Sequence, residues 1–335
     1  MSDSVSVVVP SYNHAPFVEA TLRSVFAQTH APAELVVIDD GSADGSVRRI
    51  ERALASCPFP CELVARENRG LSATLNEGLA RTRGRYFAYL GSDDVWLPEF
   101  LEARVRVLVA RPRAVLAYGN AYSIDADSRI VDSSADWARY EDGDVRRMLL
   151  GVLAPLSPTV VYRRAALAGH RWNERARLED YELYLRLSAE GEFAFDERVL
   201  SAWRVHGRNA SEDLSMMLEE RLAAQRGAAR ALKLTERELA EFQALARFRS
   251  AEEFIRRGRK LRAARLFVRS LPGVPSARDA ARTVVKLLTP QALIERRRRR
   301  AREDAFRRYG RLSLDSAGAS PEDGAARPDT KARTS

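Results

Sequence analysis

The sequence predicts an α/β protein: a mixed, mainly parallel sheet sandwiched by helices, followed by a C-terminal α-helical extension. Short β-branched or aromatic runs alternate with helical segments over roughly the first hundred residues, which is typical of a parallel sheet. After residue 216, glycine and strand patterning fade, and alanine, leucine, arginine and glutamate dominate. With 335 residues and 45% hydrophobic content, the chain is long enough for one large domain with an appendage.

Four apolar runs are predicted to be the parallel strands. Each is too short for a helix and ends at a proline or a polar turn. They cover residues 4–10, 35–38, 62–65 and 86–90. After the first run, Val18, Leu22 and Val25 recur at helical spacing, and further helices are predicted over 46–55 and through 76–80. This alternation implies right-handed crossovers between parallel strands.

The strand ends bring polar side chains to one edge of the predicted sheet. Tyr12 follows the first strand, residues 39–40 follow the second, and residues 68–70 follow the third. Asp93 and Asp94 follow the fourth. Because ligands of open α/β sheets bind at the carboxyl ends of the strands, we expect these side chains to line one crevice. Such a crevice offers an aromatic face for a base and carboxylates for base or ribose edges.

Asp93 and Asp94 together form a hard-oxygen site suited to Mg²⁺ or Mn²⁺ bridging a diphosphate. Each feature also has a plain structural explanation. Tyr12 can lie at the edge of the core, Asp40 can form an Asx turn, residues 68–70 can form a simple loop, and residues 93–94 can be a solvated turn. Their combination at one sheet edge favours a nucleotide-binding site.

Other classes of protein fit the sequence poorly. It has no G-x-x-x-x-G-K-[ST] loop and no G-x-G-x-x-G after the first strand, which argues against phosphate-loop NTPases and dinucleotide dehydrogenases. Cys57 and Cys61 have no further cysteine pair or nearby histidine, so free thiols in a reducing compartment are favoured over a zinc site. The N-terminal residues do not resemble a signal peptide, and no segment is long enough to cross a bilayer. These features favour a cytoplasmic protein.

Two stretches resemble the donor half of the inverting glycosyltransferases of family 2, which have the GT-A fold. They are VSVVVPSYNHAPFVEATLRSVFAQTHAPAELVVIDDGSADGS and ENRGLSATLNEGLARTRGRYFAYLGSDDVW. The resemblance implies a nucleotide-diphosphate sugar as donor. Pro10 and Tyr12 fall where the family packs the nucleobase, with Ser11 between them also assigned to the donor, and Asp40 falls where a carboxylate reads the edge of the base.

The resemblance also assigns the residues around the sugar and the diphosphate. Asn68, Gly70 and Asn76 lie in the segment that lines the donor site. Asp93 falls on the donor carboxylate and Asp94 on the metal carboxylate of the family, so the implied cofactor is Mg²⁺ or Mn²⁺. One departure is Gly91, where many members carry another aspartate.

A second acidic cluster opens the predicted helix at residues 178–187. Taken alone, Glu179 and Asp180 in its first turn are ordinary partners of the helix dipole. The resemblance implies instead that Asp180 is the catalytic base, with Glu179 as fallback. His206, in the segment RVHGRNAS, resembles the late histidine that family members bring to the diphosphate or metal, the alternative being a surface histidine. His14 is expected to be a surface residue rather than a ligand.

Between the two acidic clusters, a helix near residues 96–110 and strands at 114–118, 155–162 and around 199–204 are predicted. The polar segment 125–144 is predicted to be an irregular lid or acceptor loop. It contains Trp137 and Tyr140, which either stack on a sugar ring or anchor the loop to the core.

The positive charge of the chain belongs to its C-terminal third. Residues 1–214 contain 26 arginines and 31 acidic residues, whereas the remainder contains 29 basic and 15 acidic residues. Residues 215–270 are predicted to be a helical extension, with breaks at Gly227, near residue 234 and at Gly258, and residues 237–270 are expected to form a helical hairpin. Residues 271–312 are predicted to be basic amphipathic helices and residues 313–335 a disordered tail.

The basic helices suit the anionic face of a membrane. Ala281, Val285 and Leu288 belong to an apolar stripe, and the arginines at 296–300 follow Pro290. A solvated charged helix is the plain alternative. A nucleic-acid surface is the third reading and is not expected, because no aromatic residues interleave the arginines.

The sequence therefore predicts a metal-dependent inverting glycosyltransferase, cytoplasmic and peripheral on the inner face of the cytoplasmic membrane. Its acceptor is expected to be a glycan or a lipid-linked glycan of a bacterial surface polysaccharide. The alternatives are a non-catalytic binder of nucleotide sugars or nucleic acid, and a nucleotidyltransferase.

Overall fold

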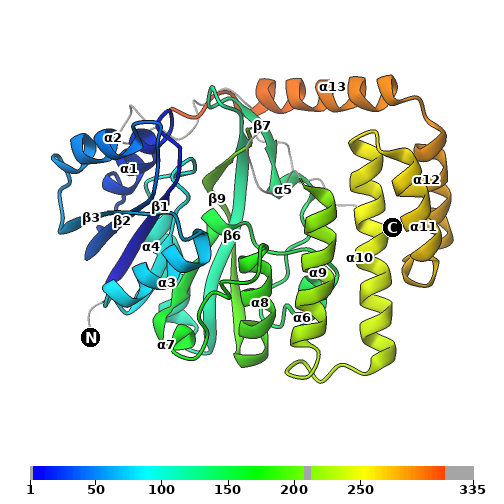
Figure 1. Cartoon of the computed structure of the whole chain (residues 1–335), viewed down its shortest axis with the longest axis horizontal. Helices are drawn as coiled ribbons and strands as arrows, with labels where there is room; N and C mark the ends of the chain where they lie inside the picture. The colour runs from blue at the N-terminus through cyan, green and yellow to red at the C-terminus, as the bar shows by residue number, and fades with distance from the viewer. Residues whose placement is uncertain (1–2, 207–212, 314–335) are drawn as a thin grey trace, which may run out of the picture.

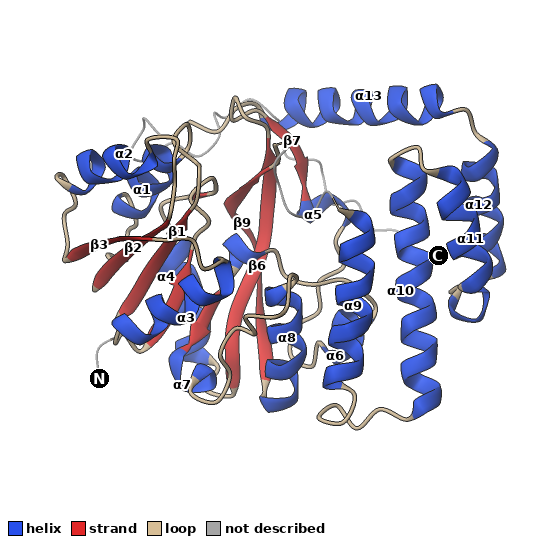
Figure 2. Cartoon of the chain, in the orientation of Figure 1, coloured by secondary structure: helices blue, strands red, loops and turns tan. Residues whose placement is uncertain are grey.

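The structure is a computed structural model that describes residues 3–206 and 213–313. Within these ranges, nine strands form one sheet with helices against it, and further helices after residue 213 stand beside it (Figure 1, Figure 2). The strand order is β3-β2-β1-β4-β8-β6-β9-β5, with β7 paired to β6. The strands are β1 (Val5–Ser11), β2 (Glu34–Asp40), β3 (Cys61–Arg66), β4 (Tyr86–Tyr89), β5 (Val95–Trp96), β6 (Ala114–Ile124), β7 (Ile130–Ser133), β8 (Val161–Arg163) and β9 (Glu192–Arg204).

The first half of the sheet consists of the four parallel strands that the sequence predicts. β3, β2, β1 and β4 pair in parallel, so that Val8 lies beside Val36 on one side and Tyr89 on the other. Residues 5–9 of β1 are fully buried, because helices cover both faces of this part of the sheet. The predicted mixed α/β fold is therefore confirmed.

Alternate residues of each strand face opposite helix layers, as the two-residue period of a strand requires. Val7 and Val37 belong to one core, and Val8 and Val36 belong to the other. The first core is covered by α1 (Val18–Phe26), α2 (Ser46–Leu54) and α4 (Phe100–Ala110). The second is covered by α3 (Leu71–Arg81), α6 (Arg146–Leu150) and α8 (Glu179–Glu190). The carboxyl ends of the parallel strands remain as the edge where a site can form.

Several predicted boundaries are wrong. The strand expected at 155–162 is a 3-10 helix at Ser157–Thr159, followed by the short β8, because Pro158 cannot donate to a strand ladder. The strand expected around 199–204 is the end of β9, which begins at Glu192. The segment 125–144 is not wholly irregular, since it contains β7 and α5 (Ser134–Trp137).

The C-terminal helices form a bundle beside the sheet (Figure 1). They are α9 (Leu214–Ala228), α10 (Glu236–Arg256), α11 (Lys260–Arg269), α12 (Ala277–Leu288) and α13 (Gln291–Tyr309). The expected hairpin is confirmed as α10 and α11, which turn at Gly258. The break predicted at Gly227 lies one residue before the end of α9 at Ala228, and the next helix starts where Thr235 forms a capping box with Glu238.

The last helix, α13, runs back from the bundle toward β7 (Figure 1). Its end is fixed there, because Ile130 N–H donates to Gly310 O at 3.0 Å and Tyr309 Oη donates to Asp136 at 3.0 Å. The C-terminal bundle is thus connected to the polar hairpin around β7 as well as to the sheet. The rest of the predicted tail, residues 314–335, lies outside the described residues.

Candidate active site

The carboxyl ends of β1 and β2 meet at one edge of the sheet. Ser11, the last residue of β1, donates its hydroxyl to Asp39 at the end of β2 over 3.2 Å. Asp39 also accepts from the backbone N–H and the hydroxyl of Ser42, at 2.8 and 2.7 Å. Tyr12 follows directly and is half exposed, at 50%. The predicted edge therefore presents an aromatic ring beside a hydrogen-bonded polar turn.

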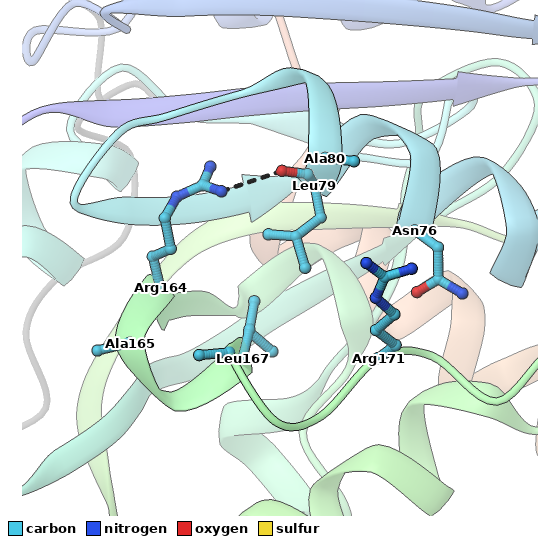
Figure 3. A pocket seen from close by; sticks show the side chains of 8 residues that line it. Asn76, Leu79, Ala80, Arg164, Ala165, Leu167 and Arg171 are labelled. Atoms are coloured by element: carbon cyan, nitrogen blue, oxygen red, sulfur yellow. Dashed lines mark hydrogen bonds between the residues drawn. The ribbon is translucent and has the colours of Figure 1, made fainter.

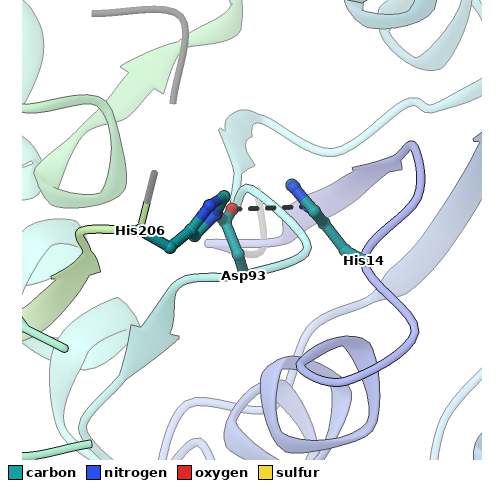
Figure 4. Close-up of side chains that lie close together, drawn as sticks. All are labelled: His14, Asp93 and His206. Carbon is teal, nitrogen blue, oxygen red and sulfur yellow. Dashed lines mark hydrogen bonds and ion pairs between the residues drawn. The ribbon is translucent and has the colours of Figure 1, made fainter. Parts of the chain in front are cut away.

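Asp93, in the loop after β4, lies between two histidines (Figure 4). His206 Nε2 is 2.9 Å from one carboxylate oxygen, and His14 Nδ1 is 3.7 Å from the other. His14 Nδ1 also lies 2.8 Å from Ser92 Oγ, and the two imidazole rings are 5.5 Å apart, edge to face. The expectation that His14 is a plain surface residue is wrong, because its partly buried ring belongs to this cluster.

The three side chains can hold a divalent cation. Ligand atoms from His14, Asp93 and His206 lie within 4.8 Å of one another and come from three distant parts of the chain. One carboxylate and two imidazoles suit a first-row cation such as Mn²⁺ better than Mg²⁺, which prefers oxygen ligands only. The donor set therefore fits a cation of the kind that the sequence predicts, held by Asp93 with both histidines.

Asp94 is packed deeper than Asp93. One of its carboxylate oxygens accepts from the Arg204 backbone N–H at 2.8 Å, and Thr21 Oγ1 donates to its carbonyl at 2.7 Å. Burial, and then the negative charge of Asp93, hold the pKa of Asp94 well above its usual range. The backbone hydrogen bond and the positive charge of Arg204 oppose this rise of the pKa. The Arg204 Nε also donates to the Asp93 backbone carbonyl at 2.8 Å.

Gly91 is the residue that leaves room for both carboxylates. A Cβ atom at this position would lie 3.0 Å from Asp93 Oδ1 and 3.1 Å from Asp94 Oδ2. Both carboxylates therefore turn back toward the Gly91 backbone, so the two oxygens lie close to one point. A residue with a side chain at position 91 would crowd these two oxygens. The absence of a side chain at Gly91 therefore lets the two carboxylates lie close together.

Asp40 organises the loop after β3. Its carboxylate accepts from the backbone N–H groups of Arg69 and Gly70, both at 2.8 Å, and forms an ion pair with Arg66. Asn68 Nδ2 donates to Asp40 O at 2.9 Å. Gly70 has φ of +88°, a conformation that glycine adopts without strain, and it opens α3. Asp40, Asn68 and Gly70 are thus brought together, as the sequence predicts for one wall of the site.

Asn76 connects α3 to a distant loop. Its side-chain amide accepts from Trp172 N–H and donates to Trp172 O, both at 2.9 Å. It also borders a cavity of about 280 Å³ that Leu79, Arg164 and Arg171 help to line (Figure 3). Arg164 Nε donates to Gly84 O at 2.6 Å, before the start of β4, so this cavity opens away from the Asp93 loop.

Asp180 lies beside the carboxyl end of β4. Tyr89, the last residue of that strand, donates its hydroxyl to Asp180, and Trp172 Nε1 donates to the other carboxylate oxygen at 3.4 Å. Burial raises the pKa of Asp180 to about 6, although both hydrogen bonds oppose the rise. Burial, followed by the charge of Asp180, raises the pKa of Glu179 to about 8. Asp180 is therefore the member of the pair that is ionised near neutral pH.

Tyr140 and Trp137 have different surroundings. Tyr140 packs against Tyr118 and Phe195 with ring centroids 5.3 and 5.6 Å apart, so it anchors its loop to the core. Trp137 is 51% exposed, and its Nε1 donates to Asp132 at 3.1 Å. Its exposed ring is the one available to an acceptor.

Comparison with known proteins identifies the family of the domain that contains the Asp93 loop. The sequence profile described as glycosyl transferase family 2 matches residues 6–170, which include the four parallel strands and the Asp93 loop but not β9. The chain carries a glycosyltransferase family 2 domain.

Curated relatives of this glycosyltransferase domain are bacterial. An uncharacterized glycosyltransferase of Rickettsia conorii is 25% identical over 229 residues, which are 64% of this chain and 36% of the relative. The chain thus spans about a third of the length of that relative. The putative teichuronic acid biosynthesis glycosyltransferase TuaG of Bacillus subtilis is 37% identical over 108 residues, 32% of this chain and 42% of TuaG.

Solved structures show the same fold. S. aureus TarS in complex with UDP-GlcNAc superposes with a TM-score of 0.60 at 17% identity, over 96% of this chain and 98% of that one. The mannosyltransferase PcManGT from Pyrobaculum calidifontis, in complex with GDP-Man and Mn²⁺, superposes with a TM-score of 0.58 at 17% identity, over 91% of this chain and 86% of that one. The GT-A fold expected from the sequence is confirmed.

The sequence did not point to several residues of the site, among them His14, Trp172 and Arg204. His14 follows Asn13 directly after the first strand, and a polar residue at a strand end was the available signal. Trp172 and Arg204 gave no local signal, because their roles depend on contacts with Asp180 and Asp94, at the ends of other elements.

Proposed function

We propose that the protein is an inverting glycosyltransferase that moves a sugar from a nucleotide-diphosphate donor to an acceptor hydroxyl. The observation that carries this proposal is the position of Asp180 beside Tyr89, which ends β4 four residues before Asp93. The end of β4 therefore lies close to two groups. One is Asp180, a buried carboxylate with a raised pKa, and the other is the cluster of His14, Asp93 and His206, which fits a divalent cation. The complexes of TarS with UDP-GlcNAc and of PcManGT with GDP-Man and Mn²⁺ support a nucleotide-sugar donor.

His14, Asp93 and His206 would hold Mn²⁺ or Mg²⁺, and Asp94 lies next to them, tied to the backbone of Arg204. A cation held there would offset the negative charge that grows on the departing diphosphate. Arg204 fixes this loop through Asp93 O and Asp94 Oδ1, which keeps both carboxylates facing Gly91.

Asp180 is proposed as the general base. Its carboxylate takes the proton of the acceptor hydroxyl while that oxygen attacks the anomeric carbon. The bond from the anomeric carbon to the diphosphate oxygen breaks, and its electron pair leaves with the diphosphate. Attack on the face opposite the leaving group inverts the anomeric configuration. Glu179, with a pKa of about 8, is protonated at neutral pH, so it would serve as the fallback base only at higher pH.

The donor would lie along the ends of β1 and β2. We assign the nucleobase to Pro10, Ser11 and Tyr12, where the exposed tyrosine ring offers a stacking face. The loop that Asp40 holds, with Asn68 and Gly70, would border the nucleoside. Asp93 would face the diphosphate, and Asn76 would support this wall through Trp172.

The acceptor is proposed to be a glycan or lipid-linked glycan of a bacterial surface polysaccharide, made on the inner face of the cytoplasmic membrane. The similarity to TuaG, whose name refers to teichuronic acid biosynthesis, supports this class. No helix of the described ranges is long and apolar enough to span a bilayer. We propose peripheral contact with the membrane through the basic region 276–312, where arginines accompany an apolar helix face.

A screen of UDP- and GDP-sugars by thermal shift, with and without Mn²⁺, tests the proposal. We expect one donor to raise the melting temperature only with the cation present, and to release nucleoside diphosphate when an acceptor glycan is added. If no nucleotide sugar changes the melting temperature with either cation, the proposed function is wrong.

A further inference from the structure

Exposed apolar side chains are concentrated at the outer end of the helical bundle. Among the described residues, seven of the twelve exposed large hydrophobic side chains lie within residues 261–293. They are Leu261, Val268, Leu271, Val284, Val285, Leu288 and Leu293. Figure 1 shows α11 and α12 at the end of the molecule farthest from β3. Single exposed apolar residues are ordinary, but such a concentration marks an interaction surface.

The inner faces of α11 and α12 already have partners. Ala263 and Phe267 of α11 pack against Phe248 and Phe254 of α10. Leu287 of α12 packs into the same clusters. The core of the bundle is therefore complete without the exposed residues, which point elsewhere.

The opposite sides of the two helices form what we call the outer face. On α11, Leu261, Arg265 and Val268 recur at spacings of four and three, and they are all exposed. On α12, Val285 and Leu288 follow the same rule on the side away from Thr283, which is buried. Each helix is thus apolar on two opposite sides, and only one side is used within the chain.

The outer face is also strongly basic. Residues 259–293 contain eight arginines and lysines but one acidic residue, Asp279. In the described part of the chain, Arg265, Arg269 and Arg278 have no carboxylate within 4.0 Å, so internal ion pairs do not account for them. Exposed aliphatic residues flanked by unpaired arginines match a surface of anionic lipid headgroups over acyl chains.

We propose that the outer face of α11 and α12 docks the protein peripherally on an anionic lipid membrane. Val268, Val285 and Leu288 enter the boundary between headgroups and acyl chains, and Arg265, Arg269 and Arg278 bind headgroup phosphates. The proposal rests on the proposed function only in that a lipid-linked acceptor would be presented there. It adds α11 to the contact and, of the region 276–312, keeps only α12.

Two other occupants fit the outer face less well. A second copy of the chain would bring two strongly basic faces together, and like charges repel at close range. Nucleic acid would find arginines but aliphatic rather than aromatic side chains between them, which do not stack on bases. The arginines at 296–300 belong to α13, which leaves the bundle to reach β7, and so lie outside this face.

Vesicle flotation with the full-length protein tests the proposal. Vesicles of phosphatidylcholine alone are compared with vesicles of phosphatidylcholine and phosphatidylglycerol in equal amounts. We expect binding only to the anionic vesicles. Leu261→Ser combined with Leu288→Ser should weaken it about tenfold or more. Arg265→Ala and Arg278→Ala should each weaken it roughly fivefold. Matched controls are Val109→Ser, an exposed valine on α4, and Arg83→Ala, an exposed arginine before β4, and both should bind as wild type does.

Each contrary result has a clear meaning. Equal flotation of the wild type and the outer-face variants overturns the proposal. So does a concentration-dependent dimer that the double serine variant abolishes, since the face would then hold a second copy. Affinity for a single-stranded oligonucleotide that depends on Arg265 and Arg278 would assign the face to nucleic acid. Donor binding in solution, measured on the same variants, should not change, so loss of docking is distinguished from failure of the glycosyltransferase proposal.

Discussion

Tyr89, the last residue of β4, donates its hydroxyl to the carboxylate of Asp180 at the start of α8. The hydrogen bond joins the strand that leads into the Asp93 loop to the proposed base. It also stabilises the ionised carboxylate in a buried position, where Trp172 is the second donor. Glu179, Tyr162 and Tyr184 are the other titratable groups that face this position.

Removing this donor should change the pH dependence of transfer. Without the hydroxyl, Tyr89→Phe should raise the pKa of Asp180 by about one to two units, because hydrogen bonds to charged groups are worth about 1.5–3 kcal/mol. The acidic limb of the kcat/KM profile should then move to higher pH while donor affinity stays unchanged. The matched control is Tyr86→Phe in the same strand, whose hydroxyl has no hydrogen-bond partner among the described residues. If both variants give the wild-type profile, Tyr89 does not position the base.

Loss of a histidine from the cation cluster should weaken metal binding. We expect His206→Ala and His14→Ala each to lower the affinity for Mn²⁺ by at least about tenfold, measured by isothermal titration without substrate. His30→Ala is the control, since its Nε2 lies 2.9 Å from Asp3 O and it does not belong to the cluster. Unchanged Mn²⁺ affinity in both cluster variants would move the cation site elsewhere.

A methyl group at position 91 should also disturb the cluster. In Gly91→Ala, the new Cβ would stand 3.0 Å from Asp93 Oδ1 and 3.1 Å from Asp94 Oδ2, so both carboxylates must shift. We expect a lower Mn²⁺ affinity with little change in melting temperature, because the displaced atoms are the ends of side chains. Gly227→Ala, where a Cβ meets nothing within 4 Å, is the control. Equal Mn²⁺ affinity in the two variants would contradict this view of the loop.

The raised pKa of Glu179 makes stability depend on pH. Its pKa is about 8 in the folded protein against 4.5 for the free side chain, so the folded state binds the extra proton between these values. The free energy of unfolding should therefore fall as pH rises through this range. Glu179→Gln keeps the neutral form at every pH, so its urea midpoint should exceed that of the wild type near pH 9 but not near pH 5.

Glu51→Gln, an exposed carboxylate on α2, controls for the loss of one charge. A wild-type free energy of unfolding that is equal at both pH values would show that Glu179 is not held in its protonated form.

The parallel half of the sheet could be predicted because its strands are buried on both faces. Residues 5–9 and 86–89 are unbroken apolar or small runs, and such runs have few alternatives. β9 was foreseen only at its end, since Glu192, Asp196 and Arg198 interrupt its pattern. These charges are satisfied by distant partners, such as Arg104 with Asp196 at 3.1 Å, which a local pattern does not reveal.

The site was predictable in its carboxylates and not in their surroundings. Asp93, Asp94 and Asp180 lie in short acidic motifs, so the sequence alone points to them. His14 and His206 meet at Asp93 only through folding, because the three residues come from the first strand end, the fourth strand end and the end of β9. The same holds for Tyr89, which reads as an ordinary buried strand residue until Asp180 is brought against it.

The most direct measurement uses Asp180→Asn with the donor that the nucleotide-sugar screen identifies. Mn²⁺-dependent donor affinity and the rate of sugar transfer are measured on the same preparation, beside the wild type. We expect unchanged affinity and a loss of transfer of about a thousandfold, because the variant keeps the cation cluster and lacks only the base. Transfer at the wild-type rate, or loss of donor binding together with transfer, would contradict the assignment of Asp180 as the base of a site built around Asp93.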